Sequence, residues 1–334
     1  MIKDLLSRIV MSVPRGRSFL YGRANSVAQP DHPQARVVIS ALGAGGLGGI
    51  GKADGWRFFP AFCDELRRRG IATHYACSLA ELERLADPAT VLLNIYGEDF
   101  EDIRSPRLRE IEERCRMVFN SADIGPVIAD KAASHEAFLA GGIPTPKRAE
   151  RGFTRQRHGT HEPTAMGAAA SETQFTTDFV DTRVTVAGKT YYTCLRALCV
   201  DDIVLQAYVR ARDAEEGIPD VHNGDTPLDP DLIETLHARL VTAKMDQIED
   251  IAARLHARFG HGFFAHDLLV DQAGRVSICE TGFKFDDYSY TGHLAPVAQD
   301  IPSIAPLFPA EAFARRSARV FAGRITPSAS DDGT

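Results

Sequence analysis

The chain has 334 residues, of which 44% are hydrophobic and 25% are charged, a composition typical of a globular protein with two or three subdomains. Its 38 basic and 45 acidic residues give a formal net charge of −7, which argues against a main role in neutralising nucleic-acid phosphates. No apolar run approaches the roughly 20 residues that span a bilayer. We therefore expect neither a nucleic-acid partner nor a membrane partner.

The six cysteines form no Cys-x-x-Cys pair, and no histidine cluster completes a zinc-binding spacing. Reduced thiols in a cytoplasmic protein are therefore expected. Residues 1–34 are predicted to form an N-terminal arm, which starts with a short amphipathic helix and continues through a segment that contains Pro and Gly.

Strands and helices alternate over residues 35–120. The predicted strands are 36–40, 73–77, 90–96 and 116–120, and the predicted helices between them are 56–69, 79–86 and 106–115. Such alternation is typical of a parallel sheet that is covered on both faces. Residues 35–120 are thus predicted to be an α/β domain.

Residues 121–325 are predicted to form a second domain, followed by a disordered tail over 326–334. A helix over 127–140 is closed by Gly141, Gly142 and Pro144. Residues 148–174 show weak periodicity and are expected to hold one or two short strands at most. The elements expected after them are antiparallel strands over 175–186, 190–200 and 203–210, helices over 231–240 and 245–259, and a hairpin over 262–270 and 275–280.

Two glycine patterns match nucleotide-binding motifs incompletely. Gly43 to Gly48 fits G-x-G-x-x-G, but the next predicted strand ends at Cys77 without the carboxylate that would hold a ribose. Residues 46–52 fit G-x-x-x-x-G-K, but Ala53 stands where a Ser or Thr should bind magnesium. We expect residues 43–55 to be a flexible loop near the active site; whether it binds substrate is open.

A series of short motifs runs through residues 119–280. In order they are Phe119-Asn120-Ser121, Asp130-Lys131, Gly142-Ile-Pro-Thr-Pro146, 155–161, 177–180, 191–196, 265–271 and 276–280. In their order and spacing the chain resembles the ATP-grasp superfamily, to which D-alanine–D-alanine ligase and glutathione synthetase belong. The resemblance implies an α/β (α+β ATP-grasp) fold, in which an N-terminal parallel α/β domain precedes two nucleotide-gripping α+β subdomains.

The resemblance also implies ATP and magnesium as cofactors and assigns roles to single residues. It implies that Lys131 and Arg155 bind phosphates, that Arg196 is a catalytic, phosphate-facing arginine, and that Asp267 and Glu280 bind the metal. The backbone of Asp178, Phe179 and Val180 would bind the adenine. In a purely structural interpretation Arg196 pairs with Asp181 or Asp202, and Lys131 is exposed.

These residue types suit the chemistry of ATP. A clustered triphosphate needs cations that converge from separate strands, and magnesium prefers carboxylate oxygens together with phosphate oxygens. Because Asp267 and Glu280 lie on the paired strands of a predicted hairpin, both side chains can face one cleft.

One position departs from the pattern of the superfamily. Gly282 stands where an Asn usually completes the second metal site, and Asp286 or Asp287 could replace it. The preferred function is an ATP- and magnesium-dependent ligase, which activates a small-molecule or peptide carboxylate as an acyl phosphate for attack by an amine. The alternatives are a small-molecule kinase and a catalytically silent ATP-binding regulator, and a homodimer is left open.

Overall fold

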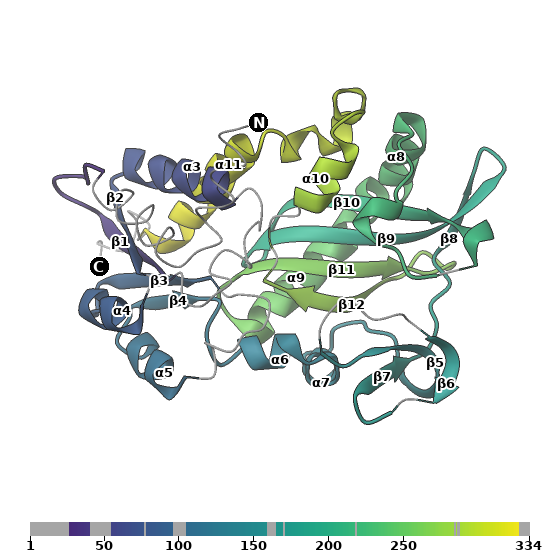
Figure 1. Cartoon of the computed structure of the whole chain (residues 1–334), viewed down its shortest axis with the longest axis horizontal. Coiled ribbons are helices and arrows are strands. Elements are labelled where there is room, and N and C mark those ends of the chain that lie inside the picture. Colours follow the sequence, from purple (N-terminus) through teal and green to yellow (C-terminus); the bar gives the residue numbers. More distant parts are fainter. Residues whose placement is uncertain are drawn as a thin grey trace, which may run out of the picture. The chain divides into compact units, whose positions relative to one another are not determined.

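The computed structural model describes residues 27–40, 55–76, 78–95, 105–158, 165–169, 171–217, 219–283, 285 and 288–326 (Figure 1). The chain divides into two compact units. The first comprises residues 1–123 together with 309–334, and the second comprises residues 124–308. None of the described helices combines the length and the apolarity that crossing a membrane would require.

A four-stranded parallel sheet forms the centre of the first unit. Its order is β2 (Ile71–Ala76), β1 (Ala35–Ser40), β3 (Thr90–Asn94) and β4 (Met117–Phe119). The connecting helices are α3 (Gly55–Arg68), α4 (Leu79–Leu85) and α5 (Pro106–Glu112). Every residue of β3 is buried, as expected for a central strand of a sheet that is covered on both faces. The predicted parallel α/β domain is confirmed.

Helix α11 (Ala310–Ile325) belongs to the first unit, although the predicted division placed it in the second. Its Phe313 and Phe321 lie on one face and pack against rings of α3, with Phe321 5.5 Å from Phe62 between ring centroids. Phe321 also contacts Phe119 of β4 at 4.7 Å between centroids. The predicted division cut the chain once between the two domains, whereas the chain goes back to the first unit after residue 308. The sequence does not show this, because the apolar stripe of a helix does not reveal which surface it will cover.

A five-stranded antiparallel sheet dominates the second unit (Figure 1). Its strands are β8 (Arg183–Val186), β9 (Lys189–Val200), β10 (Ile203–Asp213), β11 (Phe263–Val270) and β12 (Val276–Gly282). The order is β10-β9-β11-β12, and β8 pairs with β9. Helices α8 (Pro230–Leu236) and α9 (Met245–Phe259) occur where the sequence predicts them, and α9 packs against β10 and β12.

The part of the second unit that precedes this sheet differs from the prediction in three ways. The helix expected over 127–140 is broken into α6 (Gly125–Ala129) and α7 (Lys131–Ala140). Asp130 causes the break, because its backbone is extended and its carboxylate accepts hydrogen bonds from the N–H groups of Ala132 and Ala133.

The other two differences concern strands. A three-stranded sheet of order β6-β5-β7 is formed by β5 (Arg148–Gln156), β6 (Ala165–Ala169) and β7 (Gln174–Thr177). The single strand expected over 175–186 is two strands in two sheets, because β7 pairs with β5 whereas β8 pairs with β9. Two α+β subdomains with separate antiparallel sheets therefore follow the parallel domain, as the predicted fold class requires.

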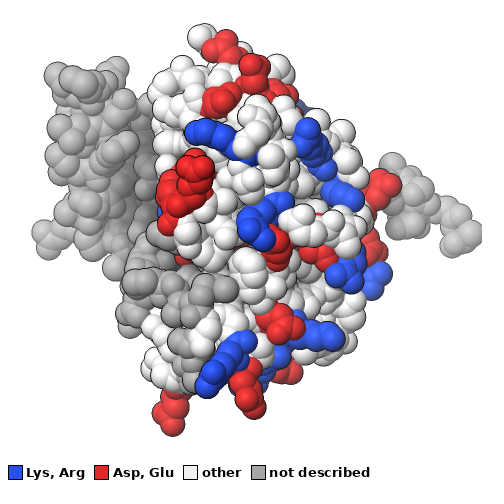
Figure 2. Space-filling model, turned by 90° about the vertical axis from the view of Figure 1, so that its right-hand side faces the viewer, with Lys and Arg blue, Asp and Glu red and all other residues white. Residues whose placement is uncertain are grey.

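Several short helical segments complete the described chain. They are α10 (Tyr288–Leu294), the π-helix His237–Val241, and the 3-10 helices Ala214–Glu216, Asn223–Asp225, Thr242–Lys244, Ala298–Asp300 and Pro302–Leu307. Figure 2 shows one face of the molecule, on which the described basic and acidic side chains are interspersed and form no large patch of one sign.

Glu112 makes the stability of the first unit depend on pH. Burial raises the pKa of Glu112 from 4.5 to about 7, although hydrogen bonds from the Ala122 N–H and the Asn94 amide favour the ionised form. Between these two pH values the folded chain holds a proton that the unfolded chain has released. The free energy of unfolding therefore falls as the pH rises through this window, by about 1.4 kcal/mol per unit of pKa shift.

We expect Glu112→Gln to remove this loss, because glutamine keeps an acceptor oxygen and carries no charge. Between pH 4 and pH 8, the wild type should lose about 1–3 kcal/mol more unfolding free energy than the variant. Denaturant titrations at several pH values measure the shift. Glu113→Gln is the matched control, because Glu113 is the exposed neighbour. An equal shift in both variants would contradict the assignment.

Candidate functional site

Three of the predicted site residues form a row across adjacent strands of the five-stranded sheet. Asp267 on β11 lies opposite Arg196 on β9 and opposite Glu280 on β12. Residues that lie directly opposite each other in antiparallel strands project from the same face of the sheet. The prediction that Asp267 and Glu280 lie on paired strands and share a face is thus confirmed.

A β-bulge next to Asp267 gives Glu280 its direction. Leu268 pairs with Ile278 and Asp267 pairs with Glu280, so Cys279 is an extra residue on β12. Without the bulge, Ile278 and Glu280 would share one face, because side chains alternate along a strand. With the bulge, Ile278 is buried on the face of Leu268, and Glu280 projects beside Asp267 and is 33% exposed.

Two arginines hold Asp267 as a carboxylate. Arg196 donates from Nε to Oδ1 at 2.8 Å and from Nη2 to Oδ2 at 2.9 Å, and Arg210 Nη2 lies 2.9 Å from Oδ1. The side chain of Arg196 is 16% exposed, that of Arg210 is 6% exposed, and that of Asp267 is 14% exposed. Burial opposes ionisation of Asp267, but the two guanidinium groups outweigh it and hold the pKa of Asp267 well below its usual range.

Glu280 has two looser cationic neighbours. Lys131 Nζ lies 3.8 Å from Oε1 of Glu280, and Arg155 Nη1 lies 4.0 Å from Oε2. Lys131 is the first residue of α7 and is only 9% exposed, so the interpretation of an exposed lysine is wrong. Arg155 projects from β5 in the other sheet and is 13% exposed.

The six side chains form one charged cluster, which we call the β-row cluster: Lys131, Arg155, Arg196, Arg210, Asp267 and Glu280. Within the described part of the chain, four cations of the cluster stand against two carboxylates, which is a formal excess of two positive charges. Excess positive charge on partly buried groups favours binding of an anion, and arginine in particular presents forked donors to phosphate.

Sequence reasoning missed Arg210, which appears there only as the last residue of the strand expected over 203–210. Its guanidinium also donates to Sγ of Cys194 at 3.0 Å. A hydrogen bond with Cys279 is the main cause that lowers the pKa of Cys194. The sequence indicates only the face from which Arg210 projects, because Arg210 lies two residues after the buried Tyr208 on a strand and therefore shares the face of that ring.

His266 contributes no charge to the β-row cluster. It is adjacent to Asp267 on β11 and therefore projects from the opposite face, where Nδ1 lies 2.8 Å from Oγ1 of Thr281. Burial lowers the pKa of His266 to about 3, so the ring is neutral at physiological pH. The positive excess of the cluster thus comes from the lysine and the arginines alone.

The predicted adenine-binding segment lies where the chain crosses from β7 to β8. The N–H of Asp178 donates to the carbonyl of Lys147 at 2.8 Å, so this group already has a partner. Phe179 is exposed, with its ring 6.5 Å from that of Tyr192. Phe179 and Val180 remain as the candidates for contact with a base. The glycine loop over 43–54 and the aspartates Asp286 and Asp287 lie outside the described residues.

The donor atoms of the β-row cluster allow a test of whether magnesium fits. A carboxylate offers about four lone pairs. On Asp267, Oδ1 accepts two hydrogen bonds and Oδ2 accepts one, which leaves one lone pair on Oδ2. Among the described residues, Glu280 makes the longer contacts to Lys131 and Arg155, so it can coordinate more fully. One or two carboxylates plus phosphate oxygens are the usual magnesium ligands, so the residues fit.

Comparisons with known proteins give similarity at the level of structure only. No protein-family model matches the sequence, and no curated protein matches it. An ATP-grasp RimK domain protein from Sphaerobacter thermophilus DSM 20745 is 14% identical, with 85% of this chain and 99% of that chain covered and a TM-score of 0.44. The ATP-grasp ligase PsnB, complexed with minimal precursor, is 12% identical with the same coverage and a TM-score of 0.47.

A third similar structure is N5-carboxyaminoimidazole ribonucleotide synthetase from Thermotoga maritima. It is 11% identical, with 80% of this chain and 77% of that chain covered and a TM-score of 0.44. Solved structures similar to this chain thus include ATP-grasp proteins, the superfamily that the sequence resembles. All three TM-scores are below 0.5.

The ion pairs predict that Asp267 and Glu280 differ in their contribution to stability. Asp267→Asn would leave two nearly buried guanidinium groups next to each other without their carboxylate. Removing one partner of a buried pair costs about 3–5 kcal/mol. Glu280→Gln should cost about 1 kcal/mol or less, because Glu280 is more exposed and its contacts are long.

Thermal and denaturant unfolding of the two variants measure this difference. Asp250→Asn is the control for a surface pair. Nε of Arg254 lies 2.9 Å from Oδ2 of Asp250, and the side chains of Asp250 and Arg254 are 53% and 48% exposed. We expect it to change the free energy of unfolding by less than about 1 kcal/mol. Equal destabilisation by Asp267→Asn and Asp250→Asn would show that Asp267 is not held as described.

Proposed function

We propose that the chain is a magnesium- and ATP-dependent ligase of the ATP-grasp type. It activates a carboxylate as an acyl phosphate, which an amine or a similar nucleophile then attacks. The observation that supports this proposal is the β-row cluster, in which four cations from four separate elements surround two carboxylates. This arrangement matches the charge of a metal-bound triphosphate and leaves lone pairs for a metal on Glu280 and on one oxygen of Asp267.

In the first step, an oxygen of the substrate carboxylate attacks the γ-phosphorus of ATP, and the bond from the γ-phosphorus to the bridging oxygen breaks. ADP leaves with the electron pair. Lys131 and Arg155 bind the phosphates, and Arg196 stabilises the charge on the transferred group. Asp267 holds the guanidinium of Arg196 by two hydrogen bonds, so this stabilisation requires little reorganisation.

In the second step, the amine attacks the acyl carbon, inorganic phosphate leaves and the nitrogen releases a proton to solvent. Magnesium, held by Glu280 and Asp267, would supply charge neutralisation of the phosphate oxygens. The protein forms no covalent bond with substrate in this scheme. Its contribution is to position the reactants and to stabilise charge.

Gly282 is the observation that favours a second candidate, a silent ATP-binding regulator. It ends β12 and pairs with Ala265, so it brings no third oxygen ligand from its side chain. A small-molecule kinase is the other alternative, in which the γ-phosphoryl group stays on its acceptor. Product analysis separates the three candidates.

We expect Lys131→Ala to raise the dissociation constant of MgATP at least tenfold, which is about 1.4 kcal/mol, because a nearly buried cation is lost. Lys189→Ala is the matched control. Its Nζ also lies 3.8 Å from a carboxylate, that of Asp213, but its side chain is 66% exposed.

Lys52→Ala should change the affinity only a few-fold, because the P-loop pattern is incomplete at Ala53. Calorimetry measures all three variants, and a larger effect of Lys52→Ala would place the nucleotide at the glycine loop.

Turnover should require a carboxylic acid and an amine together, and should release ADP and phosphate. Glu280→Gln should lower the rate at least a hundredfold, about 2.7 kcal/mol, and weaken MgATP binding much less, because the lost charge acts most strongly in the transition state. Chromatography of the nucleotide products and of the ligated product measures this. ADP together with a stable phosphorylated acceptor would establish the kinase instead. Tight MgATP binding without any turnover would establish the regulator.

A further inference from the structure

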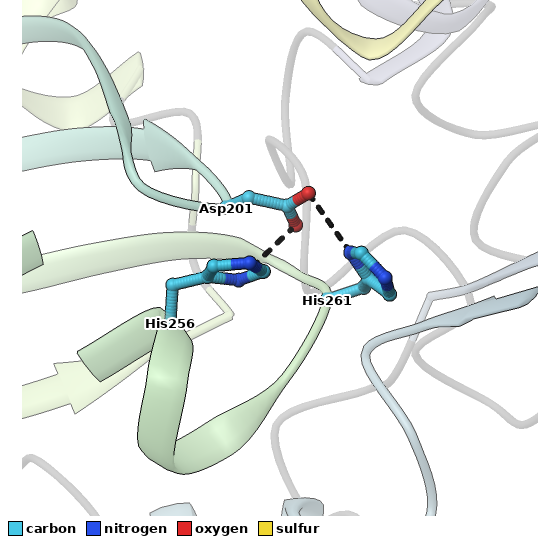
Figure 3. A group of neighbouring side chains, drawn as sticks. All are labelled: Asp201, His256 and His261. Atoms are coloured by element: carbon cyan, nitrogen blue, oxygen red, sulfur yellow. Dashed lines mark hydrogen bonds and ion pairs between the residues drawn. The ribbon is translucent and has the colours of Figure 1, made fainter. Parts of the chain in front are cut away.

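A second cluster of ionisable side chains lies outside the β-row cluster (Figure 3). Asp201 occupies the turn between β9 and β10, His256 lies in the last turn of α9, and His261 lies between α9 and β11. One ligand atom from each residue lies within 4.8 Å of the others. Within the described part of the chain, this is the one such group of three His, Cys, Asp or Glu residues.

We propose that Asp201, His256 and His261 bind a divalent transition-metal ion of the zinc class. Nδ1 of His261 lies 2.9 Å from Oδ2 of Asp201, and Nδ1 of His256 lies 3.8 Å from Oδ1 (Figure 3). In a tetrahedral zinc site, bonds of about 2.0–2.1 Å place neighbouring ligand atoms about 3.3 Å apart. The two measured distances lie on either side of this value, and one ligand atom of each residue lies within 4.8 Å of the others. An ion would draw the three side chains closer together.

Asp201 is held as a ligand should be. It is completely buried, and Oδ1 accepts a hydrogen bond from the N–H of Gly262 at 2.9 Å. The N–H of Asp201 donates in turn to the carbonyl of Gly262 at 2.8 Å. A divalent ion between the carboxylate and the imidazoles would add positive charge beside this buried group.

The two imidazoles decide the class of ion. Nitrogen ligands suit Zn²⁺, Co²⁺, Ni²⁺ and Cu²⁺, whereas Mg²⁺ and Ca²⁺ take oxygen ligands. His256 and His261 are 27% and 37% exposed, so an ion can reach the imidazoles from solvent. Three protein ligands leave a fourth position for water.

Binding replaces a hydrogen bond. The metal takes the place of the hydrogen bond between Nδ1 of His261 and Oδ2 of Asp201, and the neutral imidazole then carries its proton on Nε2. Nδ1 of His256 also lies 3.0 Å from the carbonyl of Gly260. Coordination through Nε2 keeps this hydrogen bond, an arrangement that is common in metal-bound histidine, whereas coordination through Nδ1 exchanges it for the metal.

Bound metal would link two segments that are distant in the sequence, the β9–β10 turn and the α9–β11 connection. Since the ion binds the folded chain, it should also raise the melting temperature. The site shares no residue with the β-row cluster. It can therefore be tested whether or not the chain is a ligase.

The test is zinc uptake by the full chain after removal of affinity tags and treatment with a chelator. Competition with a chromophoric chelator, in excess magnesium to occupy oxygen-only sites, measures the affinity for Zn²⁺. We expect one equivalent of Zn²⁺ per chain and a rise in melting temperature that EDTA reverses. His256→Gln and His261→Gln should each weaken binding on the order of tenfold to a hundredfold or more.

His222→Gln is the matched control. His222 also stands beside an aspartate, with Nε2 3.3 Å from Oδ2 of Asp220, but it is not part of a group with a second histidine among the described residues. It should leave zinc binding unchanged. Wild-type protein loaded with Co²⁺ gives a readout that does not depend on the folding of any variant, since X-ray absorption should show two imidazole ligands. The proposal is overturned if the wild type takes up no Zn²⁺, if His256→Gln and His261→Gln bind it as tightly as the wild type, or if no imidazole ligand is seen.

Discussion

The buried carboxylate of Asp267 is the constraint on which the β-row cluster depends. An ionised group with 14% exposure needs charged partners, and two arginines on β9 and β10 supply them. These partners also fix the register of the sheet. A slip of β11 by one residue would turn Asp267 toward the face of Leu268 and would bring His266 beside Arg196. Charge pairing and strand pairing therefore specify the same alignment.

The bulge at Cys279 lets one strand serve both the core and the site. Val276 and Ile278 are buried, and strict alternation would bury Glu280 with them. The extra residue shifts the alternation by one, so Glu280 joins Asp267 while Ile278 stays with Leu268 in the core. A carboxylate at full burial among apolar side chains would be costly, and the bulge avoids that cost.

Local patterns were sufficient to predict most of the fold. The alternation of strands and helices up to residue 120 and the hairpin that pairs Asp267 with Glu280 both follow from short-range periodicity and turn chemistry. The break at Asp130 was missed because the residue can extend a helix or cap one, and capping prevails here. The strand expected over 175–186 was wrong because periodicity does not reveal which sheet a strand joins.

The parts of the sites that escaped prediction are those made by tertiary structure. Arg210 reaches Asp267 from β10 across β9, and no spacing along the chain records that contact. Asp201 lies 55 positions before His256, so a search for local zinc-binding spacings passes over the cluster. Lys131 resembles a surface residue in the sequence, yet it is buried against Glu280 by the fold of α7 beside β12.

The donor count at Asp267 links metal and phosphate in the proposed function. Three hydrogen bonds from arginines leave one lone pair on Oδ2, so a metal that binds both oxygens of Asp267 would compete with Arg196 and Arg210 for the carboxylate. A phosphate that draws one arginine away would release lone pairs for the metal, and a metal that binds there would release an arginine for the phosphate. Each ligand would then favour the other, because coupling between two binding events is reciprocal. The excess of two positive charges also favours binding of the metal together with the phosphate, because it attracts an anion and repels a metal ion that has no phosphate bound to it.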